Sequence, residues 1–180
     1  YSKFGQFFDG KWQQAENRET YEVINPATEE TIGNASKASS IDIQKTLKSA
    51  EKGFDAWKQF SPWKRAEIIR RIANLIRERK NELANWMTLE TGKPLSEGLA
   101  EVSASADIFE WNAEETKRIY GQTIQSRFED TRVLINYEPI GVVAALSPWN
   151  FPLILAARKI STALAAGCSV ICKPDVITPG

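Results

Sequence analysis

Apolar residues recur at helical spacing through the middle of the chain and predict three helices. The first is expected over residues 40–60. Ser61 and Pro62 suit an N-cap and a first helical position, so a longer second helix should begin there and end at "ETGKP" (90–94). The third is expected over 96–120. The positions expected to face the core are Ile43, Leu47, Ala50 and Phe54, then Ile68, Ile72, Leu75, Ile76, Leu83 and Met87, and finally Val102, Ala106, Phe109 and Ala113.

Short β patterns precede and follow these helices. Near the N-terminus, Asp9-Gly10 and the "NPAT" sequence of residues 25–28 are turn sequences between short apolar stretches, and they predict two pairs of strands. After Gly121 the apolar residues alternate with polar ones or are β-branched. This change of period predicts an extended arm of two strands within residues 123–139.

Residues 140–180 carry the most informative pattern of the chain. The apolar run "GVVAAL" is bounded by Gly141 and Pro148 and predicts a strand. A helix is expected over 152–166, closed by Gly167, and "CSVICK" predicts a second strand. Strand, helix and strand in so short a stretch form one βαβ unit, whose strands are parallel and whose crossover is right-handed. The fold class is therefore expected to be α/β.

Two polar residues follow the strands of this unit. Ligands bind outside the carboxyl ends of the strands in open parallel sheets, and both Asn150 and Lys173 are expected at that edge. Asn150 is either a ligand-binding group at this edge or a cap of the following helix. Lys173 is either a ligand-binding group or an ordinary solvated lysine at a strand end.

Composition narrows the chemistry. The 180 residues carry 23 basic and 23 acidic side chains, and this zero net charge gives no electrostatic case for nucleic acid or an anionic membrane as partner. The basic residues of 70–80 lie at helical spacing and predict a solvated helix face, and no apolar run approaches the ~20 residues of a membrane span. The chain has no histidine, so no metal site is expected. Cys168 and Cys172 are expected to share one face of a buried strand as core residues rather than a redox pair, in a cytoplasmic protein.

Several motifs, in order along nearly the whole chain, resemble the NAD(P)-dependent aldehyde dehydrogenase family. They are "INPAT" (24–28), "ETGKP" (90–94), "EPIGVV" (138–143), "SPWNFP" (147–152), "ALAAGCSVICKP" (163–174) and "TP" (178–179). The resemblance implies the N-terminal part of a Rossmann-like, parallel-sheet dinucleotide-binding domain, with preceding helices and an extended β arm. Residues 1–122 and 140–180 would belong to that domain, and 123–139 would form the oligomerisation arm of a homodimer or homotetramer.

The resemblance also implies roles for individual residues. Asn150 would donate its amide to the oxyanion that forms when a catalytic cysteine attacks the aldehyde. Strictly NAD-using relatives often have glutamate where this chain has Val176, so NADP is more plausible here, although the Asp175 carboxylate weakens that inference. The cofactor is therefore NAD or NADP. Its expected contacts are Leu146, Ser147, Pro148, Trp149, Asn150, Lys173, Pro174, Asp175 and Val176.

Arg158 and the "EWNAEETKRIYG" stretch (110–121) resemble succinate-semialdehyde dehydrogenases within the family. The resemblance implies a carboxylate-bearing semialdehyde as substrate, held by Arg158 and Phe151 and oxidised to the acid through a cysteine thioester. Alternatively, Arg158 is a surface arginine on an amphipathic helix.

The nucleophilic cysteine, general-base glutamate and Gly-rich turn of the family lie C-terminal to the matched region. The 180-residue chain is therefore expected to be an inactive N-terminal fragment of the enzyme. The alternative is a short, non-catalytic binding or assembly protein that keeps this scaffold.

Overall fold

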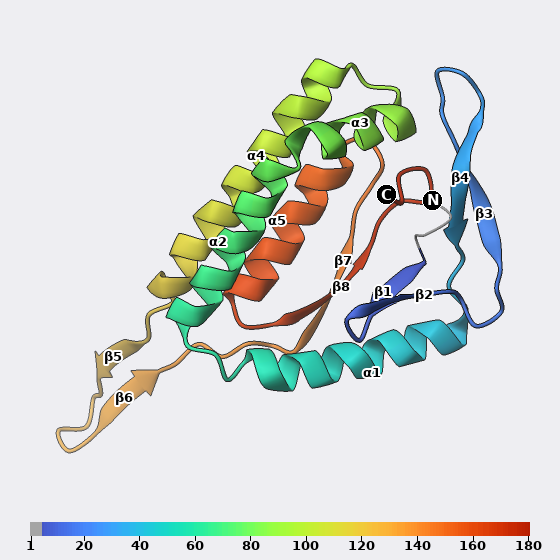
Figure 1. Ribbon diagram of the computed structural model, residues 1–180. Coiled ribbons are helices and arrows are strands. Elements are labelled where there is room, and N and C mark those ends of the chain that lie inside the picture. Colours follow the sequence, from blue (N-terminus) through green and yellow to red (C-terminus); the bar gives the residue numbers. More distant parts are fainter. Residues whose placement is uncertain (1–4) are drawn as a thin grey trace.

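The computed structural model describes residues 5–180 and contains helices, three antiparallel strand pairs and one parallel pair (Figure 1). The α/β class is confirmed. In chain order the elements are β1 (Gln6–Phe8), β2 (Lys11–Gln13), β3 (Thr20–Ile24), β4 (Thr31–Ser36), α1 (Ser40–Trp57), α2 (Pro62–Glu78), α3 (Lys80–Thr91), α4 (Leu95–Glu115), a 3-10 turn (Thr116–Arg118), β5 (Gln122–Gln125), β6 (Arg132–Ile135), β7 (Val142–Leu146), α5 (Pro152–Ala165) and β8 (Ser169–Lys173).

The two predicted N-terminal strand pairs are present. Asp9 and Gly10 join β1 to β2, and both have positive φ angles (51° and 74°), as a tight hairpin turn requires. Between β3 and β4, the Asn25 side chain accepts a hydrogen bond from the backbone of Ala27 at 2.9 Å. This side-chain bond is the local turn chemistry that favours asparagine at such a position.

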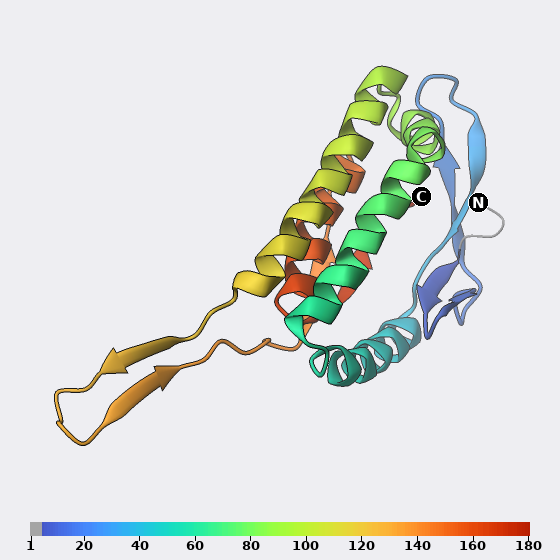
Figure 2. The same cartoon turned by 60° about the vertical axis from the view of Figure 1, so that its left-hand side comes forward.

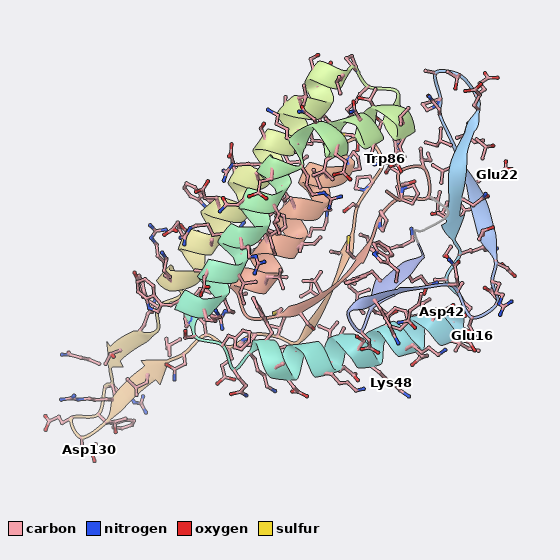
Figure 3. The ribbon with its side chains drawn as sticks, viewed as in Figure 1. Glu16, Glu22, Asp42, Lys48, Trp86 and Asp130 are labelled. Carbon is pink, nitrogen blue, oxygen red and sulfur yellow. The ribbon has the colours of Figure 1, made fainter. Side chains whose placement is uncertain are left out.

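Helix α1 begins at a buried carboxylate. The backbone amides of Ser39 and Glu16 donate to Asp42, at 2.8 Å and 3.1 Å, and thereby join the start of α1 to the segment after β2 (Figure 3). Burial acts to raise the pKa of Asp42, but the hydrogen bonds from the Ser39 hydroxyl and from the two backbone amides together outweigh it and lower the pKa. The predicted apolar stripe is wrong in its first half, because Ile43 is 58% exposed and Leu47 is also exposed.

The predicted second helix is in fact two helices. Helix α2 starts as expected, with the Ser61 hydroxyl accepting from the Lys64 amide and Pro62 in the first turn. It ends before Arg79, where the backbone leaves the helical region (φ −94°, ψ 17°), and α3 follows in a new direction. On α2 Ile69 is fully buried, whereas Leu75, predicted to face the core, is exposed.

Helices α2, α4 and α5 run side by side and enclose the larger hydrophobic core (Figures 1 and 2). Much of this core consists of alanine, whose small side chain allows neighbouring helices to approach closely. The predicted inward face of α4 is confirmed. The buried members of the core are Ala66, Ile69, Ala73, Phe109, Ala113, Ala157 and Ala165.

The predicted βαβ unit is confirmed, and its two strands are parallel. They lie between α5 and α1 (Figure 1). The Trp57 indole of α1 donates to the Leu164 carbonyl of α5 at 2.9 Å, and the Ser169 hydroxyl of β8 donates to the Ala50 carbonyl at 2.8 Å. Cys168 is buried as predicted, but Cys172 is exposed, so the expectation of two buried cysteines on one face is wrong.

Strands β5 and β6 form an antiparallel arm that projects from the helices, with Asp130 in the loop at its tip (Figures 2 and 3). The arm exposes large apolar side chains, among them Leu134, Val133 and Ile124. Within residues 5–180, no helix combines the length and the apolarity that crossing a membrane requires.

Glu90, near the end of α3, connects this helix to the C-terminal segment. Its carboxylate is buried and accepts a hydrogen bond from the Gly180 amide at 3.0 Å. Burial raises the pKa of Glu90 to about 7, although the bond from Gly180 acts in the opposite direction.

This buried carboxyl predicts a pH dependence of stability. Between pH 4.5, the ordinary value of the group, and about 7, the folded chain retains a proton that the unfolded chain releases. The free energy of unfolding should therefore fall as the pH rises through this window, by on the order of 3 kcal/mol in total. Urea unfolding at a series of pH values measures the change, and Glu90→Gln should flatten it. If Glu90→Gln changes the slope no more than the exposed control Glu97→Gln, the prediction is wrong.

Candidate active site

Strands β7 and β8 end together at one edge of the sheet. Leu146, the last residue of β7, pairs directly with Lys173, the last residue of β8. The ladder extends one step further, because the Ser147 amide donates to the Lys173 carbonyl at 3.2 Å. The segments that carry Asn150 and Pro174 therefore leave the sheet from the same edge, as predicted.

Asn150 lies in the short connection between β7 and α5. The first residue flanking α5 is Phe151, not Asn150, and the Phe151 side chain cannot cap the helix. The alternative reading of Asn150 as a helix cap is therefore wrong. Its side chain is exposed, and among the described residues no hydrogen bond occupies its amide.

The missing cap of α5 is supplied by another helix. Glu101 of α4 is buried, and its Oε1 accepts hydrogen bonds from the backbone amides of Leu153 and Ile154, at 3.0 Å and 3.1 Å. A negative charge at a helix N-terminus is favourable both as acceptor and toward the helix dipole.

Lys93 completes this arrangement from the connection between α3 and α4. Its ammonium lies 2.5 Å from Glu101 Oε2 and 3.0 Å from the backbone carbonyl of Asn150, and 4.7 Å from the centre of the Phe151 ring. Gly92, with φ 72°, ends α3 in the left-handed conformation and turns the chain into Lys93.

The end of β8 and the segment after it carry one cation and one anion, Lys173 and Asp175, each with a local backbone partner. The Lys173 ammonium donates to the Pro174 carbonyl at 2.9 Å and has no acidic partner among residues 5–180. The Asp175 carboxylate accepts from the Ile177 amide at 3.1 Å in a local turn. Burial, together with the charge of Asp175, raises the pKa of the nearby Tyr21 phenol.

The sheet edge combines apolar surface with polar donors. The Ser147 hydroxyl is buried without a partner within the described part of the chain. Such an edge suits a ligand with flat apolar rings and hydroxyl groups. The large apolar side chains exposed there are Leu146, Trp149, Phe151, Val176 and Ile177.

Arg158 lies elsewhere on α5. Its guanidinium forms no ion pair within residues 5–180, and it borders an open hollow of about 450 Å³ together with Lys159, Thr162 and Ile140. None of the residues lining this hollow comes from the Asn150 connection. The structure thus brings Asn150, Ser147 and Lys173 to one edge, but it does not place Arg158 in a shared cavity with them.

Lys93 and Glu101 were not among the residues predicted from the sequence. A signal was present, because Glu101 lies four residues before Ser105 and eight before Phe109, on the buried face of the helix. A charged residue at such a position indicates a buried partner. Among the described residues, no cluster of histidine, cysteine or acidic side chains is placed to hold a metal ion.

Comparison with known proteins identifies the relatives of this chain. Residues 12–180 match the aldehyde dehydrogenase family. The chain is 42% identical to a glutarate-semialdehyde dehydrogenase of Pseudomonas aeruginosa over 96% of its own length, and 42% identical to a succinate-semialdehyde dehydrogenase [NADP(+)] of Escherichia coli over 95%. It spans about 36% of the length of these relatives.

Solved structures agree with this assignment. An NADP-dependent enzyme of E. coli superposes with a TM-score of 0.95 at 41% identity, covering 99% of this chain and 37% of the enzyme. Betaine aldehyde dehydrogenase from Staphylococcus aureus, in a complex with NAD+, also gives 0.95, at 36% identity and over 98% of this chain and 36% of that one. With the matched motifs and the geometry of the β7–α5–β8 unit, these similarities show that the chain belongs to the aldehyde dehydrogenase family.

Proposed function

We propose that this chain is the N-terminal part of an aldehyde dehydrogenase that oxidises an aldehyde to the acid with NAD+ or NADP+. The main support is the free Asn150 amide, which lies at the carboxyl ends of two parallel strands in a chain of this family. The relatives it matches are about three times longer, so the activity is assigned to the whole enzyme and not to these 180 residues. The alternative of a non-catalytic scaffold gains no support from relatives that are named as dehydrogenases.

Asn150 would act as an oxyanion donor. When a nucleophile adds to an aldehyde, the carbonyl oxygen becomes negatively charged, and a fixed neutral donor stabilises that charge without itself changing protonation state. An amide that is not already hydrogen-bonded can donate without first losing a partner. The nucleophile is assigned to the part of the enzyme outside this chain.

Lys173 and the exposed apolar residues of the sheet edge fit a dinucleotide. Leu146, Pro148 and Trp149, with Val176 on the other segment, would contact its apolar rings. The ammonium of Lys173 would hydrogen-bond ribose hydroxyls or pair with a 2′-phosphate. When bound, the nicotinamide supplies a hydride acceptor. Val176 offers no carboxylate against a 2′-phosphate, which favours acceptance of NADP as well as NAD, whereas the Asp175 carboxylate, which accepts from the Ile177 amide, keeps a negative charge nearby that acts against it.

Ser147, Asn150 and Pro174 complete the proposed cofactor contacts. Their place at the carboxyl ends of β7 and β8 supports this role, since ligands of open parallel sheets bind there.

Arg158 and Phe151 would select the substrate. The guanidinium of Arg158 has no acidic partner among the described residues, so it is available to a carboxylate on the far end of a semialdehyde. It lies six residues after Pro152, about 9 Å further along α5, in a hollow that no residue of the Asn150 connection lines, so this proposal rests on the unpaired guanidinium and on the names of the relatives. The names of the relatives, which include glutarate- and succinate-semialdehyde dehydrogenases, support this substrate class.

The intact enzyme is proposed to be a cytoplasmic homodimer or homotetramer. Large apolar side chains on the β5–β6 arm, such as Leu134, support its use in association. Cys168 and Cys172 are free thiols, which is typical of a reducing compartment.

Asn150→Ala in the whole enzyme should lower kcat by about 100- to 1,000-fold, with a small effect on KM, because the lost hydrogen bond acts mainly in the transition state. Asn150→Asp, which keeps the size of the side chain but removes the donor, should lose at least as much. Steady-state formation of reduced cofactor is the measurement. Asn74→Ala, at an exposed asparagine on α2, is the matched control. Near-normal kcat in both Asn150 variants would exclude the oxyanion role.

Arg158→Ala should reduce kcat/KM for succinic semialdehyde by about tenfold or more and leave that for a neutral aldehyde of equal length nearly unchanged, because only the first has a carboxylate to bind. The comparison needs both substrates on wild-type and variant enzyme. Equal losses of kcat/KM on the two aldehydes would contradict the assignment of Arg158 to substrate recognition.

A further inference from the structure

Lys93 and Glu101 form the most buried ion pair among residues 5–180. Their side chains are 11% and 3% exposed, whereas every other ion pair in that range is more exposed. Replacing a buried ion pair with apolar side chains is often neutral or stabilising, so stability alone is weak grounds for finding one here. We propose that Lys93 and Glu101 are positioning residues that hold Asn150 in place as oxyanion donor, an inference that rests on the function proposed above.

The two oxygens of Glu101 contact different structures. Oε1 accepts from the Leu153 and Ile154 amides and so fixes the first turn of α5. Oε2 accepts from Lys93. One carboxylate therefore joins the start of α5, two residues after Asn150, to the connection between α3 and α4.

Lys93 makes the link to Asn150 itself. An ammonium has three hydrogens to donate, and here one is directed to Glu101 and another to the Asn150 backbone carbonyl at 3.0 Å. The Phe151 ring lies against the same ammonium. The two residues joined by the Asn150–Phe151 peptide bond are thus both in contact with the same buried ammonium.

This arrangement restrains the backbone and leaves the side chain free. The bond from Lys93 is to the Asn150 carbonyl, so the Asn150 amide stays available for a ligand. An oxyanion donor is effective when its position is set before the reaction, and displacement by an ångström costs about 100-fold in rate. Loss of the Lys93 bond should therefore reduce kcat through Asn150, without removing any group that touches substrate.

The test is a kinetic double-mutant cycle in the whole enzyme. Lys93→Met should lower kcat by about 10- to 100-fold and change the KM for aldehyde less than threefold. In an Asn150→Ala background, the same change should cause little further loss, because the donor that Lys93 positions is already gone.

A second variant guards against misfolding, since Lys93→Met leaves the Glu101 carboxylate buried and unpaired. In Lys93→Met with Glu101→Gln, the glutamine oxygen can still accept from the Leu153 and Ile154 amides, and no buried charge remains. This double variant should unfold at nearly the wild-type temperature and still lose kcat.

Lys117→Met is the matched control. Lys117 also pairs with a glutamate, Glu114, and lies over an aromatic ring, that of Trp63, at the opposite end of α4. It should retain kcat. Two results would overturn the positioning role while the proposed function stands: a folded Lys93→Met/Glu101→Gln enzyme with wild-type kcat, or a loss from Lys93→Met that is equally large with and without Asn150. An Asn150→Ala enzyme with full activity would instead overturn the proposed function, and the positioning role with it.

Discussion

The buried carboxylate of Glu101 is the interaction on which the geometry of the sheet edge depends. The connection from β7 to α5 contains apolar residues and proline, and it has no side chain that caps the helix it leads into. The first amides of α5 therefore need an acceptor from elsewhere, which α4 provides. A buried carboxylate requires a cation in turn, and Lys93 meets that requirement. The demand for a helix cap thus places Glu101 and Lys93 against the Asn150 carbonyl, the Phe151 ring and the first amides of α5.

Much of the fold could be predicted from local pattern. The change from helical to alternating period marks the arm, and the run–helix–run pattern of residues 140–180 marks the βαβ unit, because these signals lie within short stretches. It was harder to predict which helix faces are buried by other elements. Helical spacing showed that Ile43 and Leu47 share a face, but it could not show that nothing within residues 5–180 buries that face fully. The break at Arg79 was missed because the apolar spacing continues across it.

The candidate site, too, could be predicted from the sequence only in part. Asn150 and Lys173 could be placed at one edge because parallel strands bring their carboxyl ends together. The choice between donor and cap for Asn150 could not be made from sequence, since it depends on Glu101, which is distant in the chain and close in space. Similarly, Arg158 is only eight residues from Asn150, yet it borders a different hollow. Closeness in sequence therefore does not show that two side chains border the same cavity.

Native-state hydrogen exchange of the Leu153 and Ile154 amides tests most directly whether Glu101 holds the start of α5. These two amides should be protected in the wild-type chain and should exchange about tenfold faster or more in Glu101→Ala, since each loses a bond to a charged acceptor. Amides in the middle of α2, such as that of Ala73, should change much less. Unchanged protection at Leu153 and Ile154 in a folded Glu101→Ala chain would contradict the account.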